Sequence, residues 1–253
     1  MCRKTTVCAV VLVLLGGCNE QRGAPAPVPP KTAPAAKAKV VPLPPAGTVA
    51  AAAAMLARHG RVLSEAQLSK SKDLFLADAG LRDGELAYLS PLKALEVLVL
   101  RGSKITDAGL PALGKLRALR KLDLAKTSVK GRGLASVASL PGLRSLALSH
   151  APVDDAGVAK LDGAKALETL LLDHTAVSDA GLKALKPLPR LKALSLANTA
   201  ITDAGLGALH NQPSLRQLWL TNTKVTLAGV KALKQVLPTC SIRFGSDSKP
   251  QRL

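Results

Sequence analysis

Leucines recur through most of the chain at a spacing of 24 residues. The clearest stretch reads ALETLLLDHTAVSDAGLKALKPLP over 166–189 and RLKALSLANTAITDAGLGALHNQP over 190–213. When the two segments are aligned, Leu170 matches Leu194 and Gly181 matches Gly205. Such self-similarity predicts a stacked repeat array, because a single unit cannot bury its apolar side alone.

Two shorter periods occur inside each unit. Paired leucines stand two positions apart at Leu74 and Leu76, Leu98 and Leu100, Leu122 and Leu124, Leu146 and Leu148, Leu170 and Leu172, Leu194 and Leu196, and Leu218 and Leu220. A spacing of two places both side chains on one face of a strand. Later apolar positions, such as Leu110, Leu113 and Leu116, are three apart, as on one face of a helix. Each unit therefore predicts a strand, a turn and a short helix, joined by a right-handed crossover.

The segment TDAGL and its variants mark the expected helix starts. Hydroxyl residues stand at the N-cap position and aspartates follow them, namely Thr106, Ser178, Thr202 and Thr226, and Asp107, Asp155, Asp179 and Asp203. A hydroxyl there accepts an unpaired backbone N–H, and a carboxylate suits the positive end of the helix dipole. Six of the seven units carry a glycine two residues after the aspartate position (Gly109, Gly133, Gly157, Gly181, Gly205 and Gly229), which indicates close packing between turns rather than a phosphate loop.

Other columns of the repeat predict turn contacts. Thr127, Thr175, Thr199 and Thr223, together with Ser103, follow the strands and are expected to satisfy backbone groups at the sheet edge.

The third unit departs from the pattern, because Lys130, Gly131 and Arg132 replace the usual Thr-Asp-Ala. Either a loose turn or an anion contact fits those residues.

The consensus LxxLxLxxTxVTDAGLxxLxxLxx, kept in register through seven units, resembles the bacterial leucine-rich repeat family of the 24-residue type. The resemblance implies an α/β fold: a right-handed leucine-rich repeat solenoid with a parallel β-sheet on the concave face and short helices on the convex face. It also implies that ligands lie on the concave sheet, and it covers the seven repeats over 72–238.

The N-terminal segment has the pattern of an export signal. Arg3 and Lys4 precede an apolar run over 7–15, which is too short to span a bilayer. Its ending, Leu-Gly-Gly-Cys, resembles a bacterial lipobox, so residues 1–17 are expected to be a lipoprotein signal peptide and Cys18 the lipidated residue. A plain signal peptide with an incidental cysteine is the alternative. By resemblance to enterobacterial sorting, Asn19 favours the outer membrane.

Residues 18–48 are rich in proline and alanine and predict an extended tether, since proline fixes φ and removes a donor. Residues 49–71 are expected to form an N-terminal helical cap, with a helix over 49–58, a stop at Gly60, a short strand over 61–63 and a second helix from Ser64. An amphipathic membrane helix is the alternative.

Residues 239–253 predict a closing strand over 239–244, with Cys240 part-buried, and a frayed polar tail after Gly245.

Composition narrows the core and the partners. Aromatic residues are 2% of the 253 residues against 47% hydrophobic residues, so the core is expected to be aliphatic. The 35 Lys and Arg exceed the 17 Asp and Glu by 18, which gives a net charge of +18. The electrostatic field of this charge favours anionic partners. The cysteines at 2, 8, 18 and 240 suit neither a zinc site nor a disulfide framework. We therefore expect no metal and no cofactor.

The candidate ligand surface is the side of the sheet opposite the core leucines. The expected binding residues there are Phe75, Val99, Arg101, Lys121, Asp123, Leu171, Asp173, Gln217 and Trp219. Trp219 stands between two core leucines and is expected to point outward, where tryptophan is a frequent binding hot spot. It could equally cover the C-terminal edge of the array.

A second column runs along one rim of the sheet. It reads Lys72, Glu96, Arg120, Arg144, Glu168, Lys192 and Arg216. Its basic members Arg120, Arg144, Lys192 and Arg216, with Arg117 and Lys121 nearby, predict a basic rim for an anionic cell-envelope polymer. A solvated charged rim is the alternative. We expect no nucleic-acid partner, because aromatic residues for base stacking are missing.

Candidate chemistry is sparse. His150 and His174 are 24 residues apart, with Asp173 beside them, so a transition-metal site or acid–base chemistry is one interpretation and two exposed loop histidines the other. His59 and His210 are expected at the surface. The chain has no recognisable Ser/His/Asp set.

The sequence therefore predicts a membrane-anchored extracytoplasmic leucine-rich repeat protein, exported and lipid-anchored to the cell envelope at the outer membrane or periplasmic face. It is expected to be a non-catalytic protein-binding scaffold whose partner is another protein or a cell-envelope component. Electrostatic binding of anionic envelope polymers is the second hypothesis. A metal-dependent hydrolase at His150, His174 and Asp173 is the third.

Overall fold

The computed structural model describes residues 43–253, apart from 186–187 and 247–248. The chain divides into two units, Met1–Val41 and Pro42–Leu253, and the description below concerns the second. The predicted signal peptide, Cys18 and most of the tether lie outside the described residues. None of the described helices has the length and apolar character that a membrane span requires.

The strands follow one another in a single sheet in chain order. They are β1 (Asp73–Phe75), β2 (Val97–Val99), β3 (Lys121–Asp123), β4 (Ser145–Ala147), β5 (Thr169–Leu171), β6 (Ala193–Ser195), β7 (Gln217–Thr221), β8 (Ser241–Ser246) and β9 (Lys249–Arg252). From β1 to β8 every neighbouring pair is parallel and each residue faces the one 24 positions later, as Leu74 faces Leu98. The predicted leucine-rich repeat solenoid is confirmed.

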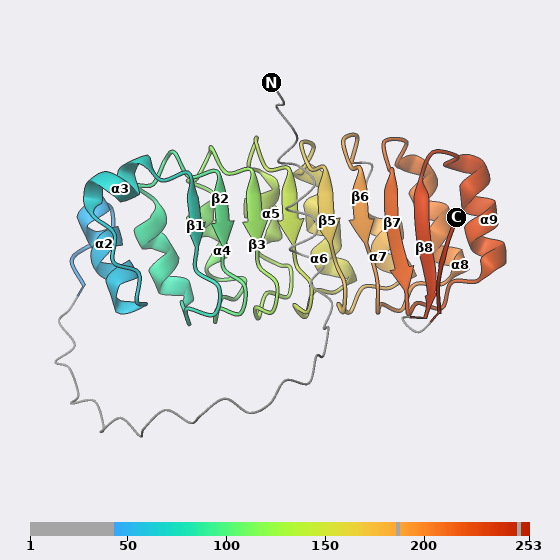
Figure 1. Ribbon diagram of the computed structural model, residues 1–253, viewed down its shortest axis with the longest axis horizontal. Coiled ribbons are helices and arrows are strands. Elements are labelled where there is room, and N and C mark those ends of the chain that lie inside the picture. The colour runs from blue at the N-terminus through green and yellow to red at the C-terminus, as the bar shows by residue number, and fades with distance from the viewer. Residues whose placement is uncertain (1–42, 186–187, 247–248) are drawn as a thin grey trace, which may run out of the picture. The chain divides into compact units, whose positions relative to one another are not determined.

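Two helices precede β1, and the others connect the strands on one side of this sheet (Figure 1). They are α2 (Val49–Arg58), α3 (Glu65–Lys70), η1 (Asp83–Leu89), α4 (Leu110–Leu113), α5 (Leu134–Ala138), α6 (Asp155–Ala159), η2 (Lys160–Gly163), α7 (Asp179–Ala184), α8 (Asp203–Leu206), η3 (Gly207–Asn211) and α9 (Leu227–Val236), where η denotes a 3-10 helix. The short helices follow from the 24-residue period, because a strand, two turns and a helix must share each unit.

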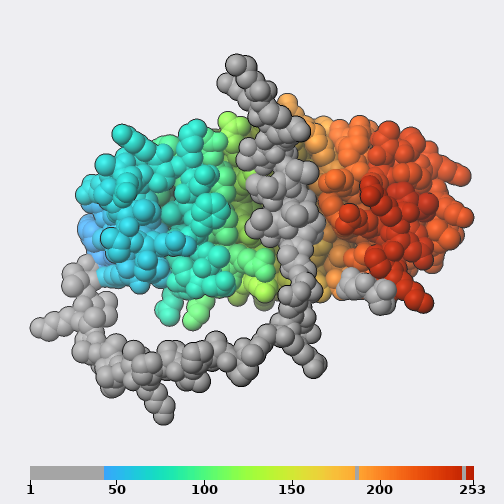
Figure 2. Space-filling model, viewed as in Figure 1, coloured from blue at the N-terminus to red at the C-terminus, as the bar shows by residue number. Residues whose placement is uncertain are grey.

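The core lies between the sheet and the helices. Both leucines of every strand pair are buried, with Leu98 and Leu100 fully covered and Leu74 only 3% exposed. In the space-filling view the successive turns lie directly against one another (Figure 2). Burial of an aliphatic side chain contributes about 1.5–3 kcal/mol, so stacking identical layers is the main source of stability.

The turn after each strand is left-handed. Residues in this column have φ between 53° and 60° at Asp78, Lys126, His150, His174, Asn198 and Asn222, and Gly102 takes the same place at 70°. The hydroxyl that follows closes the turn, because Thr127, Thr175, Thr199 and Thr223 donate to the carbonyl three residues earlier at 2.5–2.7 Å. The predicted bonding of these threonines to backbone groups is therefore confirmed, and Ser103 donates instead to Leu76 O of the preceding unit at 3.5 Å.

The aspartates of the helix starts tie each turn to the next. The side chain of Asp179 accepts the backbone N–H of Thr202 at 2.8 Å and its hydroxyl at 2.6 Å. The same paired contact joins Asp83 to Thr106, Asp155 to Ser178 and Asp203 to Thr226. We name these contacts the aspartate ladder. The N-cap role predicted for Thr202 is also confirmed, because its hydroxyl accepts the N–H of Ala204.

The ladder explains the recurring glycines at 109, 181, 205 and 229, whereas those at 133 and 157 lie against the backbone of the preceding unit. A Cβ at Gly205 would overlap Oδ1 of Asp179, and one at Gly229 would overlap Oδ1 of Asp203. At Gly207, two residues further along, a Cβ would meet no atom within 4 Å. Close packing between turns, as predicted, therefore requires glycine in this column.

The third unit forms a defined turn rather than a loose one. Gly131 has φ of +113° and lies against Gly157 of the next unit. Asp107 accepts the N–H groups of Lys130, Gly131 and Gly133 at 2.9–3.1 Å. Gly131 stands at the aspartate position of the ladder and offers no carboxylate to the next turn. The next helix still has a side-chain cap, since Asp154 accepts the N–H of Gly157 at 2.9 Å.

The N-terminal cap forms as expected at its helices. Ser64 and Gln67 make a capping box at the start of α3, and Gly60 follows α2 with φ of +73°. Two predictions were wrong. Residues 61–63 form no strand, and His59 is half-buried rather than superficial, because its Nδ1 bonds Ala79 O at 2.7 Å and its Nε2 bonds Glu85 at 2.9 Å.

The C-terminal end closes with two strands. β8 continues the parallel sheet, and the tail predicted to be frayed instead forms β9, antiparallel to β8. Cys240 is fully buried at the end of the core, which raises the pKa of its thiol to about 11. The thiol is therefore not a reactive group at neutral pH.

Candidate functional site

The predicted ligand-binding residues lie on the face of the sheet away from the helices, as the alternation of the strands requires. The strand register aligns Phe75, Val99 and Asp123 in one row. Phe75 is 55% exposed, and Gln217 is also exposed. The half-buried members are Val99, Arg101, Lys121, Asp173 and Trp219, whereas Asp123 and Leu171 are 7% exposed. The apolar surface is therefore most accessible at the β1 end of the face.

The acidic side chains at the middle of the face are occupied by hydrogen bonds. Asp173 accepts the Ser149 hydroxyl at 2.9 Å and also the Ser195 hydroxyl, so it joins the segments that begin with β4, β5 and β6. Asp123 accepts the N–H of Ala125 at 2.8 Å. Burial raises the pKa of Asp123, while this hydrogen bond and Arg101 oppose the rise. These contacts give both carboxylates a structural role.

His150 and His174 occupy the left-handed turn column, and their rings stack with centroids 4.1 Å apart and planes 13° apart. Burial, then the neighbouring His174, Lys126 and Arg101, lower the pKa of His150, and Asp173 opposes them. Among the described residues, no group of three or more His, Cys, Asp or Glu side chains could hold a metal ion. The hydrolase hypothesis therefore gains no support from this cluster.

The predicted basic rim is largely paired with its own glutamates. Glu96 contacts Lys72 at 2.8 Å and Arg120 at 3.1 Å. Glu168 contacts Arg144 at 2.9 Å and Lys192 at 2.8 Å. These cations hold the pKa of both carboxyls below the ordinary value, with the hydrogen bonds from Lys72 to Glu96 and from Lys192 to Glu168 as the largest causes.

Arg216, the last predicted member of the rim, donates instead to the carbonyls of Pro213 and Leu215 at 3.0 and 3.1 Å. The rim is thus a column in which each glutamate lies between two cations, while Arg120 and Arg144 are adjacent to each other. Such exposed pairs contribute little to stability, at most about 1 kcal/mol each, but they reduce the field that a continuous basic stripe would have.

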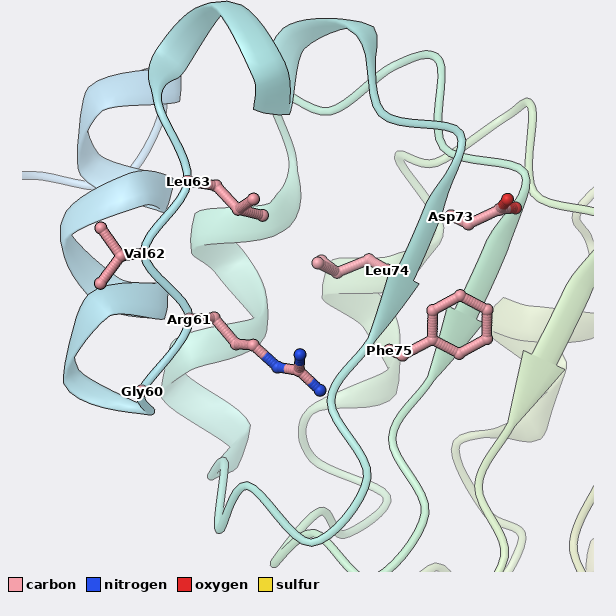
Figure 3. Close-up of a pocket in the computed structure, with 7 residues that line it drawn as sticks. All are labelled: Gly60, Arg61, Val62, Leu63, Asp73, Leu74 and Phe75. Atoms are coloured by element: carbon pink, nitrogen blue, oxygen red, sulfur yellow. The ribbon is translucent and has the colours of Figure 1, made fainter.

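A slot lies beside the free edge of β1, with a volume of about 320 Å³, and is lined by Gly60, Arg61, Val62, Leu63, Asp73, Leu74 and Phe75. We name it the β1 slot. Figure 3 shows Arg61 and Leu63 extending from the cap segment toward β1, and Leu74 extending back toward them. Val62, at 85% exposure, and Phe75 are among the most exposed apolar side chains of the described part of the chain.

The backbone beside the β1 slot is available for pairing. Lys72 O accepts from Val97 N at 2.9 Å and Leu76 N donates to Val99 O at 2.8 Å, so the even-numbered residues of this segment bond β2. The groups of Asp73 and Phe75 must then point the opposite way, into the slot. In the described residues no backbone hydrogen bond joins segment 61–63 to β1.

Sequence reasoning missed the β1 slot. Its signal was available in part, since the first strand of any repeat sheet has one unpaired edge and Phe75 stands in that strand. The distance between the cap and the strand depends on how α2 and α3 pack. That packing does not follow from a repeat pattern.

A comparison with protein families agrees with this architecture. A family model described as leucine-rich repeat matches residues 189–209, which contain β6 and the start of the following helical segment. A comparison with curated proteins gives no match.

Proposed function

We propose that this leucine-rich repeat protein is an exported, lipid-anchored scaffold that holds a protein partner on the open face of its sheet and catalyses no reaction. The observation that carries the proposal is the accessible β1 end of that face, where exposed Phe75 borders strand groups that have no backbone partner. Leucine-rich repeats are in general suited to protein binding, because a rigid sheet presents side chains at fixed spacing.

The chemistry of the face supports binding rather than catalysis. Asp173 accepts hydrogen bonds from two serine hydroxyls, and the imidazole ring of His150 stacks on His174. Among the described residues, no hydrogen bond joins that ring to Asp173 or to either serine, and only the backbone N–H of His150 reaches Asp173, at its carbonyl oxygen. A general base must lie within hydrogen-bond reach of the group it deprotonates, and the serines donate to a carboxylate instead. The described residues of the face thus offer shape and hydrogen bonds, with no assembled nucleophile.

The partner's contact is expected to combine two features of the β1 end. Covering an exposed aromatic ring such as Phe75 contributes about 1.5–3 kcal/mol. An extended segment of the partner can add to the edge of β1, where the groups of Asp73 and Phe75 offer main-chain hydrogen bonds. Trp219 supplies a second aromatic contact near the other end of the face.

Pull-down from envelope extracts tests this function. Phe75→Ala and Trp219→Ala should each reduce recovery of the same partner at least tenfold relative to the unaltered protein. Val236→Ala is the matched control, because Val236 is 46% exposed on α9, on the helical side. Equal recovery with all three variants would contradict binding through the sheet face.

Membrane attachment is tested separately. Cys18→Ala should move the protein from the membrane fraction to the soluble fraction, because a lipid chain contributes about 0.8 kcal/mol for each buried methylene group. Metabolic labelling with a fatty acid should mark the unaltered chain and leave the variant unlabelled. Membrane attachment that persists in the variant would contradict a lipid anchor at Cys18.

Binding of an anionic envelope polymer is the second candidate, and it is favoured by the net charge of +18. The ion pairs of the rim place less free charge there than the sequence indicates. Binding that does not weaken as salt increases would exclude this candidate, since attraction between exposed charges is screened.

A further inference from the structure

Four arginines surround a pocket on the charged rim of the sheet. The pocket is formed by residues that precede β3, β4, β5 and β6 in the chain. The pocket has a volume of about 260 Å³, and its charged lining consists of Arg117, Arg120, Arg144 and Arg190. All four side chains are exposed. We name it the arginine pocket. Arg190 was not among the candidate residues of the sequence, and Arg117 was named there only as a neighbour of the rim.

The 24-residue register brings these side chains together. Arg120 and Arg144 hold equivalent positions in neighbouring turns, and the column of Ala118, Gly142 and Ala166 ends at Arg190. Neighbouring strands are about 4.8 Å apart, so the column from 118 to 190 extends over roughly 14 Å. Small residues thus line the length of the pocket, and they leave room for a ligand between arginines at its two ends.

The charges around the pocket are not balanced. Arg120 and Arg144 contact Glu96 and Glu168, but each glutamate is shared with a lysine of the rim. Arg117 and Arg190 have no acceptor among the described residues. Four arginines, two lysines and two carboxylates therefore leave an excess of four positive charges over one short stretch of surface.

We infer that the arginine pocket binds a ligand with more than one phosphate group. Guanidinium groups present forked donors that match phosphate oxygens in pairs. A bound anion reduces the repulsion between the arginines. A di- or oligophosphate supplies several negative charges over the length of the pocket, whereas a single carboxylate supplies one. The inference does not depend on the proposed protein partner, because no residue of the pocket belongs to the β1 end of the sheet face.

Isothermal titration calorimetry of the full chain with inorganic tripolyphosphate tests the inference. We expect saturable binding with one ligand per chain. The double variant Arg117→Gln and Arg190→Gln should weaken the affinity at least tenfold. It should keep its fold, because both side chains are exposed and neither has a partner in the described structure. An unchanged circular dichroism melting curve verifies this.

The matched control is the double variant Lys130→Gln and Arg132→Gln, which removes two exposed positive charges at the third helix start. Its affinity should stay within twofold of the unaltered protein. Equal weakening in both double variants would show a general charge effect and overturn the pocket. Absence of saturable binding to the unaltered chain would overturn it as well.

Vesicles distinguish the source of the phosphate. Vesicles of phosphatidylcholine with cardiolipin, whose headgroup carries two phosphates, are compared with vesicles of phosphatidylcholine alone. Retention on the first that is lost in the Arg117→Gln, Arg190→Gln variant supports the inference with a lipid headgroup as ligand. Tripolyphosphate binding without vesicle retention supports it with a soluble or polymeric phosphate.

Discussion

Thr202 and Asp179 lie 23 residues apart in the chain and form one bidentate contact, in which the carboxylate of Asp179 accepts both the N–H and the hydroxyl of Thr202. The same hydroxyl accepts the N–H of Ala204 and so begins the next helix. One side chain therefore starts a helix and joins it to the previous turn. Local helix capping and repeat stacking are coupled in this protein.

Thr202→Val should lower the free energy of unfolding by about 1–3 kcal/mol, because the valine leaves the carboxylate of Asp179 without the hydroxyl and removes the cap. Thr169→Val is the control, since Thr169 lies half-buried on the sheet face and no side-chain hydrogen bond is found for it in the described structure. Urea unfolding measures both. Equal stability of the two variants would contradict a stabilising role for the aspartate ladder.

Gly205→Ala should be destabilising by about 1–3 kcal/mol, because the new methyl group overlaps the carboxylate of Asp179 and forces the two turns apart. Gly207→Ala in the same turn should be neutral or stabilising by up to about 1 kcal/mol, since its methyl group meets open space and φ there is negative. Thermal unfolding of the two variants checks the difference. Similar losses would mean that the glycine column has another cause.

The pKa of His150 should lie below the ordinary value of about 6.5, chiefly because of burial and then because of the positive neighbours His174, Lys126 and Arg101. The stability due to neutral His150 is then complete above that value and declines as the pH falls through it. His174→Asn, which tolerates the left-handed turn, should raise the pKa of His150 in an NMR titration. An unchanged pKa would show that the stacked ring has no electrostatic effect.

Glu168→Gln should cost about 0.2–1 kcal/mol at pH 7, because it removes the partner of Arg144 and Lys192 at an exposed site. The pKa of Glu168 is lowered, so its stabilisation is present above the ordinary value of about 4.3 and disappears as the pH falls through the lower folded value. Urea unfolding at pH 7 and pH 3 should show a difference in unfolding free energy between the two proteins that narrows at the lower pH. A difference of the same size at both values would assign the effect to packing.

The sequence was sufficient to predict the fold because the repeat keeps its length. The strand leucines, the glycine column and the threonine turns recur every 24 positions, and each reflects a local requirement that the same unit repeats. The ends were predicted less well. His59 is half-buried and the tail forms β9, because both depend on contacts that occur once and leave no period.

The residues of the open face were predictable from the sequence, and the contacts between their side chains were less so. Alternation along the strands indicated which residues share the open face, among them Phe75 and Trp219. The sequence could not indicate that Glu96 and Glu168 each hold two cations of the rim, because side-chain reach decides such pairs. The β1 slot and the arginine pocket likewise depend on distances between turns.

Gly131 interrupts the aspartate ladder between the third and fourth units, where Asp154 caps its own helix but accepts no contact from a carboxylate of the preceding turn. Among the described repeats up to α9, this is the junction that lacks a carboxylate contact of the aspartate ladder. If the array were pulled from its two ends, we would expect the repeats to separate first at this junction. Each fragment would keep its remaining aspartate-ladder contacts. If force were applied between the two termini, the array would thus separate into two folded fragments rather than unfold one repeat at a time.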